Sequence, residues 1–194
     1  DLCAIMLADS AHIQEKDAEF LARRGREYVE PLYDTADVIR TIELMIGVPL
    51  KRTVDIAPGV RLTYTEAGHF LGSASVPLEC TDPPGTHRLV FSGDIGRRGL
   101  PIIRDPEPPP GGDALILEST YGDRDHQSVE GARERLGAIV RDTAARGGRI
   151  LIPAFAVGRT QEILYELHLL RREGKVPEIP VILDSPLAID ATGI

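Results

Sequence analysis

The stretch Arg88-Leu89-Val90-Phe91-Ser92-Gly93-Asp94-Ile95-Gly96 decides the fold of this chain. Its three consecutive large apolar residues, 89–91, predict a strand that is buried on both faces. The next two residues break this strand and leave Asp94 at its C-terminal end, between glycines. Because glycine adds no side-chain bulk, the Asp94 carboxylate can approach a metal ion or a phosphate closely.

The same arrangement recurs at two other predicted strand ends. Residues 62–69 end in His69, and residues 114–118 end in Glu118. Three strands therefore each deliver an ionisable residue at the C-terminal end. This pattern predicts a functional site.

The first part of the chain is predicted to hold two helices and several strands. Residues 2–7 suggest a strand or another buried segment, whereas 14–24 and 34–46 have the apolar spacing of helices. Further strands are predicted over 53–66, broken by a turn at 58–59, and over 73–80, followed by a hairpin turn at 83–86. The proline-rich residues 105–112 predict a surface connection, because proline fixes φ and removes amide donors.

After Glu118 the pattern changes to an alternation of helices and strands. Helices are predicted over 130–145 and 159–172, and strands over 149–153 and 180–184. Such an alternation is typical of a βαβ unit with a parallel sheet.

Composition indicates a soluble globular protein with no membrane-spanning segment, and the order of predicted strands and helices makes it an α/β protein. Of the 194 residues, 42% are hydrophobic, and they form no long uncharged apolar run. The net charge of −8 lies mostly in residues 1–122, which carry 19 acidic and 12 basic residues. This balance argues against nucleic-acid binding through a broad basic face.

Cys3 and Cys80 are isolated and are expected to be buried, reduced thiols of a cytosolic protein. Both termini look cut, which suggests a segment of a longer protein.

Each candidate site residue also has a structural interpretation. His69 is either a zinc ligand or a histidine satisfied by a hydrogen bond in the core. Asp94 either bridges two metal ions or binds its own backbone at 95–96. Glu118 either orients a histidine or caps a helix. Arg159 either binds phosphate at a helix N-terminus or belongs to an ordinary strand–helix turn. The other histidines lack ligand spacing and are expected at the surface or in packing: His12, His87, His126 and His168.

Four motifs together resemble the β-CASP branch of the metallo-β-lactamase-fold nucleases. They are Gly68-His69-x-Leu71-Gly72-Ser73-Ala74, Ser92-Gly93-Asp94-Ile95-Gly96, Leu117-Glu118-Ser119-Thr120-Tyr121-Gly122-Asp123 and the segment 152–162, and 184–188 resembles the family's next segment. This branch includes RNA-processing exonucleases and the cleavage factor of mRNA 3′-end processing. The resemblance implies part of a metallo-β-lactamase αββα sandwich over 1–122, followed by the start of an inserted parallel βαβ (β-CASP) domain over 123–194.

The resemblance also implies a role for each candidate residue. His69 is similar to the family's histidine on the first zinc ion, and Asp94 to the aspartate that bridges both zinc ions. Glu118 is similar to the first β-CASP acid, which supports a later histidine that protonates the leaving oxygen. Arg159 and Ser185 are expected near the substrate phosphates, in a cleft between the two domains.

By this resemblance the parent protein is a zinc-dependent phosphodiester hydrolase of RNA, or of DNA as in some members, and cuts internally or from an end. The resemblance also implies a cytoplasmic location and either a homodimer or partners in a processing complex. The family's His-x-His-x-Asp-His cluster and its C-terminal histidine motifs are not in the chain. With two of the three or four ligands that a zinc site needs, this segment alone is expected to be inactive.

Two alternatives remain open at this point. One is a metallo-β-lactamase-fold hydrolase of small esters or thioesters, against which the β-CASP-like segment after Glu118 speaks. The other is a non-catalytic scaffold subunit of an RNA-processing complex, which the presence of His69 and Asp94 disfavours.

Overall fold

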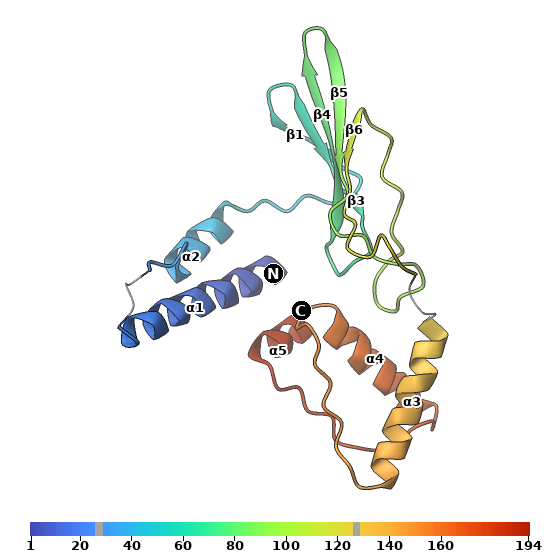
Figure 1. Ribbon diagram of the computed structural model, residues 1–194. Helices are drawn as coiled ribbons and strands as arrows, with labels where there is room; N and C mark the ends of the chain where they lie inside the picture. The colour runs from blue at the N-terminus through green and yellow to red at the C-terminus, as the bar shows by residue number, and fades with distance from the viewer. Residues whose placement is uncertain (26–28, 126–128) are drawn as a thin grey trace. The chain divides into compact units, whose positions relative to one another are not determined.

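The structure, a computed structural model, describes residues 1–25, 29–125 and 129–194 (Figure 1). It divides into two units. The first comprises Asp1–Gly47, Phe155–Val157 and Val181–Ile194, and the second comprises Val48–Ala154 and Gly158–Pro180. His126 lies outside the described residues, and the predicted domain boundary between 122 and 123 stays a prediction. The mixed α/β class is confirmed.

The first unit is helical, with α1 (Leu2–Arg23), α2 (Thr35–Leu44) and α5 (Pro186–Gly193). The prediction of a strand or another buried segment over residues 2–7 is wrong, because these residues form the first turns of α1 and none of them is buried. Leucine, methionine and alanine are good helix formers, and a short apolar run does not by its period distinguish strand from helix. Cys3 is therefore an exposed, free thiol on this helix and not a buried one.

Small residues let the helices of this unit approach one another. Ala11 and Ala18 of α1 are buried, as are Val38 of α2 and Ala188 of α5. The predicted second helix is confirmed, and it starts at a capping box in which Asp34 and Asp37 each accept the other's backbone N–H.

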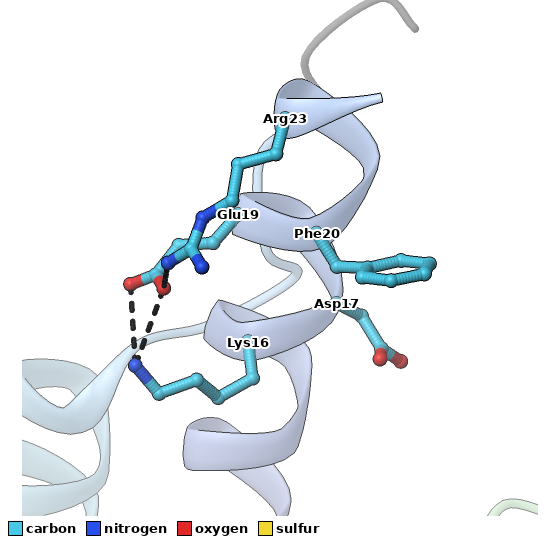
Figure 2. A pocket seen from close by; sticks show the side chains of 5 residues that line it. All are labelled: Lys16, Asp17, Glu19, Phe20 and Arg23. Atoms are coloured by element: carbon cyan, nitrogen blue, oxygen red, sulfur yellow. Dashed lines mark hydrogen bonds and ion pairs between the residues drawn. The ribbon is translucent and has the colours of Figure 1, made fainter. Parts of the chain in front are cut away.

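A shallow hollow on α1 is lined by five side chains of that one helix (Figure 2). Lys16 and Arg23 both pair with Glu19, at 3.2 and 3.0 Å. Exposed pairs at this helical spacing contribute only about 0.3–0.5 kcal/mol each. Since no second element adds a functional group, the hollow is not a candidate site.

The second unit contains the sheet. Its strands are β1 (Thr53–Ala57), β2 (Val60–Thr63), β3 (Thr65–Glu66), β4 (Ala74–Asp82), β5 (Gly85–Phe91) and β6 (Ala114–Ile116). The order is β1-β2-β4-β5-β6, with β3 paired to β4. Only β5 and β6 pair in parallel; the other neighbours are antiparallel. The strands predicted over 53–66 and 73–80, and the hairpin turn before β5, are confirmed.

The strand β5, which lies between β4 and β6, is buried on one face only, and this corrects the prediction for residues 89–91. Val90 is 1% exposed, whereas Phe91 on the other face is 37% exposed. The connection after β5 covers the Val90 face, since a Cβ on Gly112 would lie 2.9 Å from Val90 Cγ2. Since side chains on a strand alternate between its two faces, one face of β5 is covered and the other is partly exposed.

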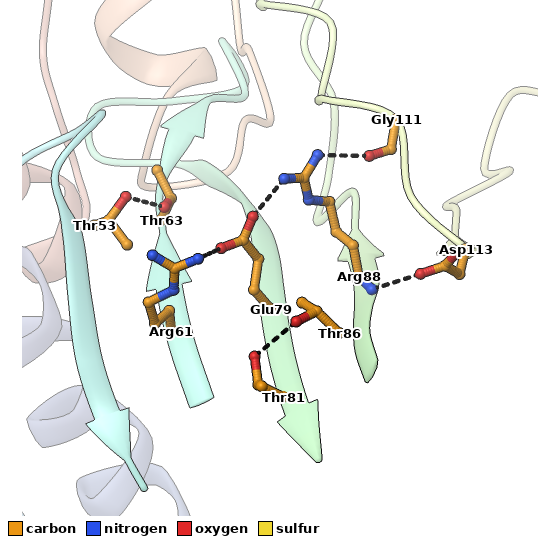
Figure 3. A network of polar contacts seen from close by, with 9 residues as sticks. All are labelled: Thr53, Arg61, Thr63, Glu79, Thr81, Thr86, Arg88, Gly111 and Asp113. Atoms are coloured by element: carbon orange, nitrogen blue, oxygen red, sulfur yellow. Dashed lines mark hydrogen bonds and ion pairs between the residues drawn. The ribbon is translucent and has the colours of Figure 1, made fainter. Parts of the chain in front are cut away.

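Farther along β5, toward its N-terminus, the sheet carries a ladder of charges (Figure 3). Glu79 of β4 lies opposite Arg61 of β2 and Arg88 of β5 and forms an ion pair with each. The Arg88 guanidinium is the main cause that holds the pKa of Glu79 below its ordinary value. Because a one-residue slip would move these charges to the other face, the ladder favours the observed register.

The remaining helices of this unit, α3 (Val129–Ala145) and α4 (Arg159–Arg172), are confirmed. They pack around Val140, Leu170 and Val176.

The strands predicted over 149–153 and 180–184 are wrong, because neither segment has a ladder partner among the described residues. Their side chains are largely exposed, Leu151 at 95% and Ile182 at 84%. The predicted parallel βαβ sheet is therefore absent from the described part of the chain. None of the helices there is both long and apolar enough to cross a membrane.

The contrast between two leucines of this unit tests the helical core. Leu170 is 2% exposed and Leu151 is 95% exposed. Leu170→Ala is expected to lower the free energy of unfolding by about 2–5 kcal/mol, because it leaves a cavity between α3 and α4. Leu151→Ala is expected to change it by less than about 0.5 kcal/mol. Urea denaturation of both variants measures the difference, and equal losses would contradict this description of the core.

Candidate metal and catalytic site

The directions of the strands bring the three candidate strand ends to one edge of the sheet. β3 is antiparallel to β4, β4 is antiparallel to β5, and β5 is parallel to β6. It follows that β3, β5 and β6 run the same way. His69, Asp94 and Glu118 come after the C-terminal ends of these strands. The structure thus gathers at one edge the three residues that the sequence singles out.

A backbone contact joins the loop that carries His69 to the loop that carries Asp94. The N–H of Gly96 donates to the carbonyl of Ala67 at 2.8 Å. A Cβ at position 96 would lie 1.6 Å from the carbonyl oxygen of Gly68, so that only glycine permits this approach.

Glu118 binds the turn on both sides of Asp94. Its Oε1 accepts from the N–H of Ile95 at 2.8 Å, and its own N–H donates to Ser92 Oγ at 3.0 Å. Oε2 accepts from the N–H of Thr120 at 3.3 Å. The Ile95 N–H is the largest cause that lowers the pKa of Glu118, followed by the Thr120 side chain, and the charge of His69 adds to them. Glu118 is therefore ionised, and its carboxylate accepts a hydrogen bond that holds the turn containing Asp94. It caps no helix.

The structure does not support the structural interpretations of His69 and Asp94. The N–H groups of Ile95 and Gly96, which a turn aspartate would bind, are taken by Glu118 and by Ala67. His69 is exposed, and its ring meets the edge of Phe70 with centroids 5.5 Å apart. Among the described residues no hydrogen bond engages the Asp94 carboxylate or the His69 imidazole.

Imidazole nitrogen and carboxylate oxygen are ordinary zinc ligands, so these two side chains suit part of a zinc site. Within the ranges that the structure describes, no group of three or more histidine, cysteine, aspartate or glutamate side chains could hold a metal ion. The donor set here is thus a partial one.

Arg159 begins α4, whose N-terminus lies beside the His69 loop. A Cβ on the N-cap residue Gly158 would be 3.6 Å from the Cβ of Phe70, the neighbour of His69. The guanidinium pairs with Glu162 at 2.7 Å, while 58% of the Arg159 side chain is exposed. The residues before α4 form no strand, so the predicted strand–helix turn is an irregular segment leading into a helix.

Ser185 is the N-cap of α5, where its hydroxyl accepts from the N–H of Ala188 at 3.2 Å. It belongs to the first unit, whereas the other four candidates belong to the second. Its predicted place near substrate phosphate stays a prediction.

Sequence reasoning missed two residues that build this site, Ser92 and Gly96. Both lie inside the motif that contains Asp94. The signal for Ser92 was a small polar residue directly after a buried strand, a position where a hydroxyl often binds nearby backbone. For Gly96 the close approach to another loop has no local signal.

Comparison with known proteins shows that the chain is related to the β-CASP nucleases, which confirms the family resemblance. No family model matches it. It is 37% identical over 166 residues to the transcription termination factor FttA of Methanosarcina mazei, and 38% identical over 182 residues to that of Thermococcus kodakarensis. These matches cover 84% and 91% of the chain, and 25% and 27% of the relatives.

A third relative is Ribonuclease TTHA0252 of Thermus thermophilus, which is 41% identical over 128 residues. This match covers 66% of the chain and 28% of the relative. The chain thus spans about a quarter of the length of the curated relatives it matches.

Ionisation of Glu118 is expected to stabilise the protein in a pH-dependent way. Because its folded-state pKa is below the ordinary value of 4.5, the stabilisation is present above pH 4.5 and is lost as the pH falls through the lowered pKa. Glu118→Gln is expected to cost about 1 kcal/mol at pH 7, and this difference from wild type should shrink toward pH 3. Urea denaturation of the full-length protein at several pH values measures it. Glu134→Gln, at an exposed position of α3, is the control, and a pH-independent loss in Glu118→Gln would contradict the assignment.

Proposed function

We propose that this chain is part of a metal-dependent ribonuclease, in which 1–122 belong to a metallo-β-lactamase αββα sandwich and 123–194 to a β-CASP domain. The observation that carries the proposal is the joining of the His69 and Asp94 loops, with both side chains unengaged among the described residues, beside an ionised Glu118. The names of the relatives, a ribonuclease and transcription termination factors, support RNA as the substrate.

His69 and Asp94 would hold zinc in this proposal, with the remaining ligands supplied by other parts of the parent protein. A bound zinc ion lowers the pKa of water and offsets negative charge on a phosphate, which is what phosphodiester hydrolysis requires. The exposed position of both side chains leaves them accessible to substrate.

In this proposal the Glu118 carboxylate accepts hydrogen bonds that orient the backbone near Asp94. It does not act as the general acid that protonates the leaving oxygen. A carboxyl group whose pKa is lowered is ionised at neutral pH and has no proton to give. Its two oxygens receive N–H groups from Ile95 and Thr120, which hold the turn around Asp94. The proton for the leaving oxygen must come from another group, which agrees with a role for Glu118 in supporting a histidine elsewhere in the parent.

Arg159 supplies a forked donor that suits a phosphate of the substrate. Its present partner is Glu162, one turn along the same helix, whose side chain is only 15% exposed. Ion pairs near the surface typically contribute about 0.2–1 kcal/mol, so that a phosphate can compete with Glu162 for the Arg159 guanidinium. The N-terminus of α4 adds a favourable dipole for the same anion.

None of the described contacts favours the ester hydrolase or the scaffold over the ribonuclease. A homodimer or processing-complex partners, a cytoplasmic location, and the role of Ser185 stay predictions for the parent.

Asp94→Ala in the full-length protein tests the proposal. RNA cleavage is expected to fall at least about a thousandfold, because the variant lacks a metal ligand and the preorganised charge that it fixes. The melting temperature should stay close to that of wild type, since the described residues make no hydrogen bond to this carboxylate. Asp82→Ala, at the exposed end of β4, is the control. A fully active Asp94→Ala enzyme would remove the basis of the assignment.

The isolated chain of 194 residues gives a second test. With only two candidate ligands it is expected to lose zinc on mild chelation and to cleave no RNA, because a stable zinc site needs about three or four protein ligands. Zinc content is measured by atomic absorption after gel filtration with a chelator. Stoichiometric zinc that survives this treatment would show that the ligand set is wrongly assigned.

A further inference from the structure

Ser92 is buried, and all of its hydrogen-bonding groups are engaged. Its exposed fraction is 1%. Its N–H donates to the carbonyl of Ile116 at 2.9 Å, and its carbonyl accepts from Ser75 Oγ at 2.7 Å. Its hydroxyl donates to the carbonyl of Gly93 at 2.7 Å and accepts from the N–H of Glu118 at 3.0 Å.

The bond to Gly93 fixes the backbone that leads into Asp94. The Gly93 carbonyl belongs to the peptide that joins Gly93 to Asp94, so a hydrogen bond to it holds the plane of that peptide. Gly93 itself has φ +58°, and a Cβ there would lie 2.9 Å from the carbonyl oxygen of Ala74. The direction in which Asp94 leaves the strand therefore depends on a constrained turn.

The second bond of the same hydroxyl closes a ring around Asp94. The Ser92 hydroxyl accepts from the N–H of Glu118, and the carboxylate of Glu118 in turn accepts from the N–H of Ile95. The backbone before Asp94 and the backbone after it are thus both tied to Glu118.

We propose that the Ser92 hydroxyl is a positioning group that couples the Asp94 turn to Glu118. The catalytic consequence of this coupling rests on the proposed ribonuclease function, whereas the coupling itself does not. Ser92 is buried, and its action is on the geometry of the two carboxylates. Outer groups of this kind typically change metal affinity or activity about 10- to 100-fold when they are removed.

Ser75 provides a matched control for Ser92. Both serines are 1% exposed, and both hydroxyls make a hydrogen bond to backbone. Ser75→Ala removes the bond to the Ser92 carbonyl but leaves both bonds of the Ser92 hydroxyl. Ser92→Ala removes these two bonds and leaves the Ser92 backbone in place. A general effect of deleting a buried hydroxyl should appear in both variants.

Both variants are made in the full-length protein and compared in three measurements. Zinc affinity is determined by competition with a chromogenic chelator, and kcat and KM are determined on RNA. Amide hydrogen exchange is followed in the segments 92–96 and 117–120. Ser92→Ala is expected to weaken zinc binding and lower kcat, each about 10- to 100-fold, with KM within about twofold. It should also raise exchange in both segments. Ser75→Ala should change zinc affinity and kcat less than about threefold.

Two outcomes overturn the proposal. One is an equal effect of Ser92→Ala and Ser75→Ala, which would show a purely structural role. The other is unchanged amide exchange around Asp94 and Glu118 in Ser92→Ala. Failure of the ribonuclease assignment is distinguishable, because wild type would then neither bind zinc nor cleave RNA while the exchange comparison still tests the coupling.

A second pair of variants at the same position covers the case in which Ser92→Ala does not fold. Ser92→Thr keeps the hydroxyl. Ser92→Val introduces a side chain of nearly the same shape as threonine but without the hydroxyl. The proposal requires Ser92→Thr to retain the exchange protection of segments 92–96 and 117–120, and Ser92→Val to lose it. Equal protection in the two variants overturns it.

Discussion

The site depends on the hydrogen bond between the N–H of Gly96 and the carbonyl of Ala67. The strand before His69, β3, is only two residues long and cannot by itself fix the loop that follows it. Gly96 approaches this loop so closely that no side chain could stand in its place. Support from the other side comes from the N–H of Glu107, which binds the carbonyl of Glu66 at 2.9 Å. Without these backbone contacts, His69 and Asp94 would lie on two independent loops.

The parallel pairing of β5 and β6 brings Glu118 to the strand end that carries Asp94, where its carboxylate binds the N–H of Ile95. Here the N–H groups of Ile95 and Thr120 stabilise the ionised form of Glu118. The Glu118 carboxylate is therefore engaged by backbone donors, whereas the Asp94 carboxylate accepts no hydrogen bond among the described residues.

The sequence contained enough information for the strand ends but not for the contacts among them. A residue that ends an apolar run is visible locally, so His69, Asp94 and Glu118 could be identified. Gly158 lies beside Phe70 only because the intervening chain folds back, and no local pattern encodes that contact. The predicted strand over 149–153 failed for a related reason. Its apolar residues fit a strand, but a strand also needs a ladder partner, and the described residues supply none.

The backbone around the two candidate ligands, His69 and Asp94, is held by hydrogen bonds on both loops. The turn around Asp94 is held by the Ser92 hydroxyl before it and by the Glu118 carboxylate after it. The His69 backbone N–H donates to Ser73 Oγ at 2.9 Å, which closes its own loop. A ligand whose backbone is already ordered loses less conformational entropy when it binds a metal than one on a free loop. Since all these supports lie in the second unit, the order around His69 and Asp94 comes from residues 66–118.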